Sequence, residues 1–236
     1  MSELESIRNF KRVVLKLSGE ALRAVGSHDN ISPEIVGRIA REIHEAREAS
    51  NVELAIVVGG GNFWRGASAS ARGMDRATAD YVGMLATVMN ALALQAALEQ
   101  EGEECIVHSA IHMQNVAEPF IRRKASRQMS RGAIVIFAAG TGSPFFSTDT
   151  TAALRANEMN ADVIFKATMV DGVYDSDPKK NPEAKRFETV SFRQCISEEL
   201  GVMDTTAFSL CMDNNIPIII FDLGKEGNIQ TALNRG

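Results

Sequence analysis

Short apolar runs alternate with helical patterns along most of this 236-residue chain, and several of the runs end in glycine-rich segments. The apolar runs cover residues 13–17, 54–58, 105–108, 133–138, 163–166 and 216–221. Apolar residues at helical spacing cover residues 34–49, 77–101, 150–159 and 207–213. Strands that are apolar on both faces and separated by helices predict an α/β fold with a mainly parallel central sheet and helices on both faces. The run 216–221 would suit a central strand.

The chain is long enough to bury about 70% of its unfolded surface in one core. It contains no repeat, no low-complexity tract and no long linker, so we expect a single domain over residues 1–236. Two Asx-Pro pairs make residues 175–185 the most turn-rich segment, which we interpret as a boundary between two parts of that domain. Ser32 and Pro33 suit the N-cap and the first position of the helix over 34–49.

Charge and cysteine content exclude several classes of protein. With 25 basic and 30 acidic residues the net charge is −5, so no overall field attracts nucleic acid or anionic lipid. Three widely spaced cysteines and no C-x-x-C pair indicate neither a disulfide framework nor a zinc site. Residues 1–12 lack the apolar stretch of a signal peptide, and the apolar stretch 84–98 is shorter than a membrane span. We therefore expect a cytoplasmic protein that binds neither nucleic acid nor membranes.

The loop after the first strand reads Lys16-Leu17-Ser18-Gly19-Glu20. Ligands of parallel sheets bind beyond the carboxyl ends of the strands, so the loops after Leu17, Val58, Ala138 and Ala167 are the candidate binding segments. A lysine beside glycine amides suits a phosphate, because the cation and the N–H dipoles both face the anion. The alternative is a strand lysine that reaches solvent before an ordinary turn.

Three consecutive glycines follow the second strand, at residues 59–61, and Arg65 comes four residues later. Without Cβ atoms the bend allows a ligand to contact backbone, and Arg65 could bind phosphate oxygens in a bidentate manner. The alternative is a flexible turn with a solvent-facing arginine. The segment does not fit G-x-G-x-x-G, since residue 64 is Trp, and no G-x-x-x-x-G-K-[ST] occurs. Both absences weaken the dinucleotide-binding and P-loop classes.

The segment 140–149 follows the strand at 133–138 and offers hydroxyls, backbone amides, Phe145, Phe146 and then Asp149. Hydroxyls and amides could bind the polar edge of a planar ring, with phenylalanine as an apolar wall. In the alternative interpretation the two phenylalanines belong to the core, and Thr148 or Asp149 caps the following helix.

Three weaker features favour structural interpretations. Residues 171–178 carry three carboxylates and a tyrosine, but the terminal Glu of an EF-hand is missing, so a solvated turn is favoured. Cys105, His108 and His112 have ligand-like spacing, yet the first two lie in a predicted strand and no metal site is expected. The helix at 77–101 is apolar on more than one face, and its methionines indicate core or self-association.

Five motifs in order resemble the bacterial uridylate kinases (UMP kinases) of the amino acid kinase family: K-L-S-G-E, G-G-G-N-x-x-R-G, M-L-A-T-V-M-N, G-T-G-x-P-F-F-x-T-D and D-G-V-Y-x-x-D-P. The similarity extends over residues 11–234. It implies a three-layer amino acid kinase-like sandwich, with acceptor binding by residues 1–160 and ATP binding by 161–236. It also implies transfer of the ATP γ-phosphoryl group to UMP, giving UDP, in pyrimidine nucleotide biosynthesis by a cytoplasmic homohexamer.

The resemblance also assigns site residues. Catalysis is assigned to Lys16, Arg65 and Asp149, the last matching an acid that organises the lysine and the metal in relatives. ATP is placed against Lys16, Leu17, Ser18, Gly19, Gly61, Arg65, Thr168, Tyr174 and Asp177. UMP is placed against Gly60, Asp80, Thr141, Gly142, Ser143, Pro144, Phe145, Phe146, Ser147 and Thr148. Mg²⁺ is expected to arrive with ATP, and no separate protein metal site is expected.

The chain departs from the family pattern at a few positions. Ser143 stands where many relatives carry Asn, and Met169 where Lys is frequent, so a UMP hydrogen bond and a positive charge near ATP are affected. Gln95 replaces an Arg, and residues 24–29 differ from the glycine-rich segment, in the pattern associated with activation by GTP. Inhibition by UTP would follow from occupancy of the UMP site.

Two alternatives remain. A related amino acid kinase could act on acetylglutamate, aspartate or carbamate, but such substrates have no nucleobase and do not explain Asp80 together with residues 145–148. A non-catalytic nucleotide- or oxyanion-binding protein of this fold would be expected to lose Lys16 or Asp149, and both are present.

Overall fold

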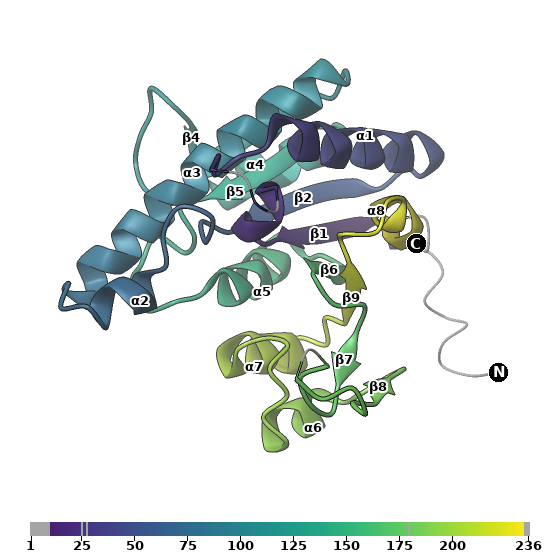
Figure 1. The fold of residues 1–236 in the computed structure, drawn as a ribbon. Coiled ribbons are helices and arrows are strands. Elements are labelled where there is room, and N and C mark those ends of the chain that lie inside the picture. The colour runs from purple at the N-terminus through teal and green to yellow at the C-terminus, as the bar shows by residue number, and fades with distance from the viewer. Residues whose placement is uncertain (1–9, 25, 27, 179, 234–236) are drawn as a thin grey trace.

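In the part of the chain that the structure describes, the central sheet has seven strands, and all of its neighbouring pairs are parallel (Figure 1). The computed structural model describes residues 10–24, 26, 28–178 and 180–233. In spatial order the strands are β4 (Glu118–Pro119), β3 (Cys105–Ser109), β5 (Ile134–Ala138), β2 (Glu53–Val58), β1 (Arg12–Leu17), β6 (Val163–Thr168) and β9 (Ile218–Asp222). The predicted α/β fold with a parallel sheet is confirmed.

Helices cover both faces of the sheet. One layer contains α1 (Pro33–Ala49), α3 (Arg76–Gln100) and α8 (Asn228–Leu233), and the other α4 (Arg122–Met129), α5 (Thr148–Met159), α6 (Phe192–Ser197) and α7 (Thr205–Asp213). Strand β1 contributes Val13 and Leu15 to the first core and Val14 to the second. Because both faces are buried, residues 13–17 are apolar on both faces rather than alternating, with Lys16 as the exception.

The start of α1 follows the sequence signals closely. Ser32 caps the helix, its Oγ accepting a hydrogen bond from the Ile35 amide at 3.4 Å, and Pro33 occupies the first turn. Pro at this position loses no helical hydrogen bond, and its fixed φ suits the helix. Two predicted segments are described only in part, because residues 1–9 of the first, and Val25 and Ser27 within the segment 24–29, lie outside the described residues.

Two expectations about the second half of the chain are wrong. Residues 218–222 form an edge strand, not a central one, since β9 pairs with β6 alone among the described strands and is mostly half-buried. Residues 175–185 are not a boundary between two parts of the domain. They connect β7 (Val173–Tyr174) to β8 (Arg186–Phe187), which pair as an antiparallel hairpin.

Helix α3 is the longest helix in the described part of the chain and crosses over β2, β3 and β5. By length and composition alone it could span a membrane, although 44% of its most apolar window is buried inside the protein. Met84 lies in the core, whereas Tyr81, Leu85 and Met89 follow one another at helical spacing on the exposed side. The two short remaining helices are η2 (Gly19–Leu22) and α2 (Gly66–Ser70).

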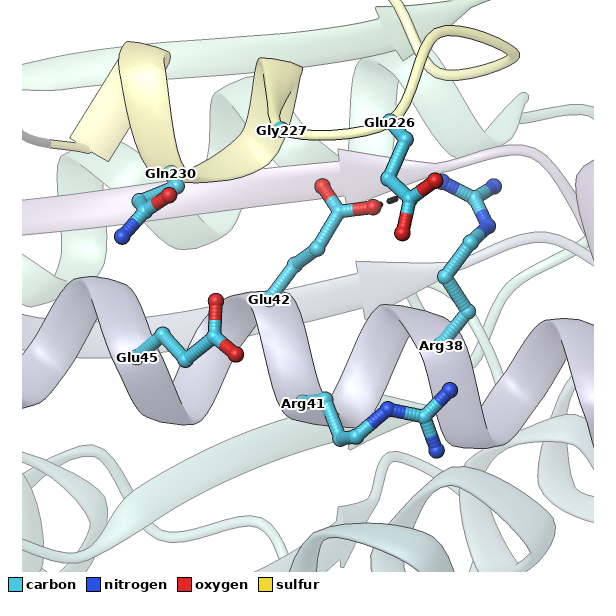
Figure 2. A pocket seen from close by; sticks show the side chains of 7 residues that line it. All are labelled: Arg38, Arg41, Glu42, Glu45, Glu226, Gly227 and Gln230. Carbon is cyan, nitrogen blue, oxygen red and sulfur yellow. Dashed lines mark hydrogen bonds and ion pairs between the residues drawn. The ribbon is translucent and has the colours of Figure 1, made fainter.

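A cavity of about 220 Å³ lies between α1 and α8 (Figure 2). Its lining consists of Arg38, Arg41, Glu42, Glu45, Glu226, Gly227 and Gln230. The buried carboxylate of Glu42 accepts hydrogen bonds from Arg38 Nη1 at 2.7 Å and from the Ile229 amide at 3.3 Å. Glu42 therefore joins the first turn of α8 to α1, which gives this cavity a structural explanation.

Glu42→Gln is expected to lower the free energy of unfolding by about 1–3 kcal/mol, because a neutral amide replaces the charged acceptor of two hydrogen bonds. Urea denaturation measures the change. Glu45→Gln, on the exposed side of the same cavity, is the matched control and should change stability by less than about 0.5 kcal/mol. Equal effects of the two substitutions would contradict this role of Glu42.

Candidate functional site

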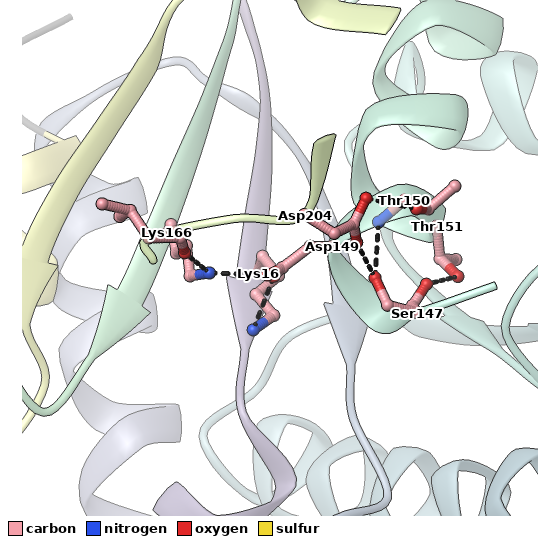
Figure 3. A network of polar contacts seen from close by, with 8 residues as sticks. Lys16, Ser147, Asp149, Thr150, Thr151, Lys166 and Asp204 are labelled. Carbon is pink, nitrogen blue, oxygen red and sulfur yellow. Dashed lines mark hydrogen bonds and ion pairs between the residues drawn. The ribbon is translucent and has the colours of Figure 1, made fainter. Parts of the chain in front are cut away.

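Two lysines and one aspartate meet near the carboxyl ends of β1 and β6 (Figure 3). Lys16 and Lys166 are direct partners in the parallel register of these strands, so their side chains leave the same face of the sheet. Asp149, in the first turn of α5, lies between them: Oδ1 is 2.9 Å from Lys16 Nζ and Oδ2 is 2.7 Å from Lys166 Nζ. Lys166 also donates to the carbonyl oxygen of Val202.

The three charged groups are largely buried, which strengthens their interaction. Burial opposes ionisation of Asp149, but the positive charges of Lys16 and Lys166 outweigh it and hold the pKa of this carboxyl below its ordinary value. Burial, together with the neighbouring charge of Lys16, lowers the pKa of Lys166. The cluster carries two positive charges and one negative charge, so it favours an additional anion.

The position of Asp149 depends on the N-terminus of α5. Ser147, not Thr148 or Asp149, is the N-cap, and its Oγ accepts from the Thr150 amide at 3.0 Å. Asp204, the N-cap of α7, accepts from Ser147 Oγ and from Thr150 Oγ1. These hydrogen bonds join the starts of α5 and α7. Because Ser147 caps α5, the carboxylate of Asp149 is available to pair with the lysines.

The loops after β1 and β2 contact each other directly. A Cβ atom on Gly19 would lie 2.5 Å from the carbonyl oxygen of Gly59 and 2.8 Å from the amide of Gly61, so no larger residue fits there. The Gly59 amide donates to the Leu17 carbonyl at 2.9 Å. The two predicted phosphate-binding segments therefore form one continuous surface beside Lys16.

The sequence interpretation of the triple glycine needs a correction. We expected all three missing Cβ atoms to make room for a ligand. At Gly60 that space is filled by α3, because a Cβ would lie 2.6 Å from the carbonyl oxygen of Gly83. At Gly59 the nearest neighbours are Gly19 and the Thr148 hydroxyl. These two glycines permit close packing of protein segments, and only Gly61, near the Glu20 side chain, retains more space.

Arg65 extends toward the loop after β1 and forms an ion pair with Glu20 there. Both side chains are exposed, so the pair is weak and its arginine remains accessible to an anion. The structure thus places Arg65 beside the loop that carries Ser18 and Gly19, and its contact with a phosphate stays a prediction.

The loop after β5 is strained and is fastened at several points. Ala139 and Phe145 have positive φ angles of 60° and 72°, a conformation that costs about 1–2 kcal/mol for a residue with a Cβ. Asp80 Oδ2 accepts from the Phe145 amide at 2.8 Å, and Arg155 Nη2 donates to the Gly140 carbonyl at 3.1 Å. Arg76 forms an ion pair with Asp80, with its Nε 2.9 Å from Oδ2. Asp80 and the predicted acceptor loop are therefore in direct contact.

The exposed side chains of this loop fit a binding wall better than a core. Phe145 and Phe146 are 66% and 52% exposed, so the alternative that they are core residues is wrong. Thr141 and Ser143 bond each other within the loop, through Thr141 Oγ1 and the backbone of Ser143. Pro144 is half-buried between these polar residues and Phe145.

The remaining predicted ATP contacts lie farther along the chain. Thr168 ends β6, and its carbonyl accepts from the Leu223 amide at 2.8 Å. Tyr174 Oη donates to Asp171 Oδ1 at 2.6 Å, and Asp177 lies 3.7 Å from Lys180. Tyr174 belongs to the small hairpin, which Figure 1 shows below the edge of the sheet formed by β6 and β9. The contact of Thr168, Tyr174 and Asp177 with a nucleotide stays a prediction.

Of the residues with ligand-like spacing, Cys105 and His108 are buried and His112 is exposed. His108 is fully buried, with Nε2 2.7 Å from Gln128 Oε1, and Cys105 is a buried free thiol whose pKa is raised to about 12 by burial. Within residues 10–24, 26, 28–178 and 180–233, no group of three His, Cys, Asp or Glu side chains is arranged to hold a metal ion by itself.

Residues 11–222 match the sequence profile described as the amino acid kinase family. The chain belongs to the amino acid kinase family. It is 38% identical to a UMP kinase from Bacillus anthracis, with a TM-score of 0.91 over 96% of this chain and 93% of that one. It is 38% identical to a UMP kinase from Ureaplasma parvum, with a TM-score of 0.87 over 93% and 92% of the two chains. A uridylate kinase from Archaeoglobus fulgidus is 30% identical, with a TM-score of 0.71 over 94% of each chain.

As a member of the amino acid kinase family the chain is a phosphotransferase, and the resemblance seen in the sequence is confirmed. Sequence reasoning missed Lys166 of the charged cluster and Asp204, which bonds to the N-terminus of α5. The signal for Lys166 was present, since V-V-L-K-L in β1 and V-I-F-K-A in β6 each place one lysine in an otherwise apolar run. No comparable signal marks Asp204, whose contacts arise from the packing of α7 on α5.

Asp149→Asn is expected to lower the free energy of unfolding by about 3–5 kcal/mol at pH 7, because two buried lysines lose their shared counter-charge. The pKa of Asp149 is depressed in the folded protein, so its carboxylate stabilises the fold above the ordinary pKa of about 4. That contribution is lost as the pH falls through the folded-state pKa. The difference between wild type and variant should therefore shrink below about pH 4.

Urea denaturation across this pH range measures the effect. Asp213→Asn, at an exposed position at the end of α7, is the control and should change stability by about 0.5 kcal/mol or less at each pH. A difference for Asp149→Asn that stayed constant between about pH 3 and pH 7 would show that its ionised form does not stabilise the fold.

Proposed function

We propose that this protein is a UMP kinase that transfers the γ-phosphoryl group of ATP to UMP, giving UDP. The observation that carries the proposal is the Lys16–Asp149–Lys166 cluster at the carboxyl edge of the sheet, next to the joined glycine loops after β1 and β2. Phosphoryl transfer requires little covalent chemistry from the protein, but it requires aligned substrates and positive charge around the transferring group. This edge of the sheet supplies both.

The two substrates repel each other, and the cluster offsets that repulsion. Two unit charges about 4 Å apart repel by about 4 kcal/mol at an effective dielectric constant of 20. Lys16 and Arg65, with the amides of the glycine loops, provide the opposing field. Asp149 holds both lysine ammonium groups in place before substrate arrives, so little reorganisation is needed during the reaction.

On the acceptor side we assign UMP to Asp80 and the loop after β5. The Asp80 carboxylate, which accepts from the Phe145 amide, suits the hydroxyl groups of a ribose, and the loop backbone suits the polar edge of uracil. Gly60, Thr141, Gly142, Ser143, Pro144, Phe146, Ser147 and Thr148 complete this side. Ser143 has a shorter side chain than the Asn of many relatives, so the bond it makes to UMP would be rearranged.

On the donor side we assign ATP to the loop at residues 16–19, to Gly61 and Arg65, and to Thr168, Tyr174 and Asp177. The part of the chain after residue 160 would then hold ATP, and the part before it the acceptor. Met169 is exposed at the end of β6, where it adds no positive charge near the phosphates.

The residues present fit Mg²⁺ that is carried by ATP. In nucleotide sites Mg²⁺ is held by one or two carboxylates together with phosphate oxygens and waters. Asp149 is the carboxylate of the charged cluster and is the residue that would contact the ion. When bound, Mg²⁺ neutralises phosphate charge.

Regulation and assembly are proposed on the same basis. UTP is expected to inhibit by occupying the UMP site. GTP is kept as a candidate activator, although Gln95, which bonds to Glu99 and to the Cys105 carbonyl, stands where the family pattern has an arginine. The exposed apolar residues Tyr81, Leu85 and Met89 of α3 support self-association, and we propose a cytoplasmic homohexamer that acts in pyrimidine nucleotide biosynthesis.

An ADP-release assay with UMP, CMP, dUMP, acetylglutamate and aspartate as acceptors tests the proposed function. We expect turnover with UMP and none with acetylglutamate or aspartate, since only a nucleotide uses both Asp80 and the loop after β5. Turnover with a small carboxylate but not with UMP would identify a related amino acid kinase instead. Nucleotide binding without turnover of any acceptor would identify a binding protein.

Lys16→Ala is expected to lower kcat by roughly 10²–10³, the effect of removing one preorganised charge-stabilising group. Steady-state kinetics with UMP and ATP measure the change. Lys11→Ala removes an exposed lysine next to the start of the same strand and serves as the control. An unchanged kcat in Lys16→Ala would remove Lys16 from the mechanism.

A further inference from the structure

Helix α3 directs two buried polar side chains, Thr87 and Asn90, at the sheet side of the helix. Thr87 is 6% exposed and Asn90 is fully buried, and their neighbours on the buried side of the helix, such as Val88, Ala91 and Leu94, are apolar. Both belong to the M-L-A-T-V-M-N motif, to which the proposed mechanism assigns no role. Buried polar groups are retained where they have specific partners.

Their partners are the first residues beyond two neighbouring strands. Thr87 Oγ1 accepts from the Ala139 amide at 2.7 Å, directly after β5, and donates to the Met84 carbonyl. Asn90 Nδ2 donates to the Gly59 carbonyl at 2.7 Å, directly after β2. Beyond the end of the ladder between β2 and β5, the polar side chains of α3 thus supply hydrogen-bond partners for the backbone.

The contact at Gly59 is part of a larger amide network. Asn62 and Asn90 exchange hydrogen bonds at 2.7 and 2.9 Å, and Asn62 Nδ2 also donates to the Asn30 carbonyl at 2.8 Å. This network fixes residues 59–62 against α3 and against the segment before α1. The contact at Ala139 holds a residue with φ of 60°, which relaxes toward a more favourable conformation unless it is held.

We propose that Thr87 and Asn90 are positioning residues that set the separation between the loop after β2 and the loop after β5. In the proposed function, on which this inference rests, these loops hold the transferring phosphate and the UMP acceptor. One helix thereby determines the alignment of the two reacting groups, although neither side chain touches a substrate. Misplacement of reacting groups by about 1 Å can cost 10²-fold in rate.

The first test compares Thr87→Val with Thr87→Ser. Valine keeps the shape of the side chain but leaves the Ala139 amide unpaired, whereas serine keeps the hydroxyl. Thr87→Val is expected to lower kcat/KM for UMP by about 10- to 100-fold, with KM for ATP changed by less than about twofold. Thr87→Ser should stay within about threefold of wild type. Asn90→Leu, which frees residues 59–62, should raise KM for both substrates.

Val88→Ala is the control for a merely structural role. It creates a cavity in the same helix without changing a contact to either loop, so it should lower Tm while leaving kcat/KM for both substrates unchanged. If Thr87→Val lowered Tm but, like Val88→Ala, left kcat/KM for UMP unchanged, the positioning role would be overturned. So would unchanged kinetic constants in Asn90→Leu.

Hydrogen exchange on the wild-type protein tests the proposal independently of any variant. The Ala139 amide should be protected as strongly as amides within β5, and rapid exchange there would overturn the proposal even if Thr87→Val did not fold. Turnover of UMP by the wild type is measured first. Absence of that turnover contradicts the proposed function, whereas turnover with an unaffected Thr87→Val variant contradicts only this inference.

Discussion

The parallel register of β1 and β6 brings two lysines together, and the rest of the site compensates for their repulsion. It places Lys16 beside Lys166 on the same buried face, where two like charges repel strongly and cannot reach water easily. Asp149 makes the arrangement stable by pairing with both. The first turn of α5 must therefore begin at one place, and the capping of α5 by Ser147 together with the Asp204 bridge to α7 ensures that it does.

The elements whose periodicity is strong were predictable from the sequence, and those defined by packing were not. The strands β1, β2, β5 and β6 and the helices α1 and α3 follow from apolar runs, helical spacing and the capping signal at Ser32. The apolar sequence of a run such as 218–222 indicates that the strand is buried, but it does not indicate which strands lie beside it. Its position at the edge of the sheet could therefore not be deduced. The two-residue strands β4, β7 and β8 depend on tertiary contacts and leave no periodic signal.

The candidate site was predictable in its residues but not in its geometry. Lys16, Arg65 and Asp80 were identified from glycine-rich motifs and from the family resemblance. Lys166 escaped notice because no glycine-rich loop follows it, although it repeats the position of Lys16 within its strand. The sequence predicted that Gly59 and Gly60 make room for a ligand, but the structure shows protein segments packed against them. A missing Cβ indicates close approach without saying whether a ligand or another part of the protein approaches.

The chain separates two tasks that phosphoryl transfer combines. Positive charge is held by β1, β6 and α5, whose contacts are short and buried, while the loops that face the substrates are fastened to α3. Asp80, Thr87 and Asn90 all lie on that helix. The contacts that hold these loops on α3 include neither Lys16 nor Lys166. Loss of such a contact would therefore change the alignment of the loops and leave the charged cluster in place, whereas loss of Asp149 would disturb the cluster directly.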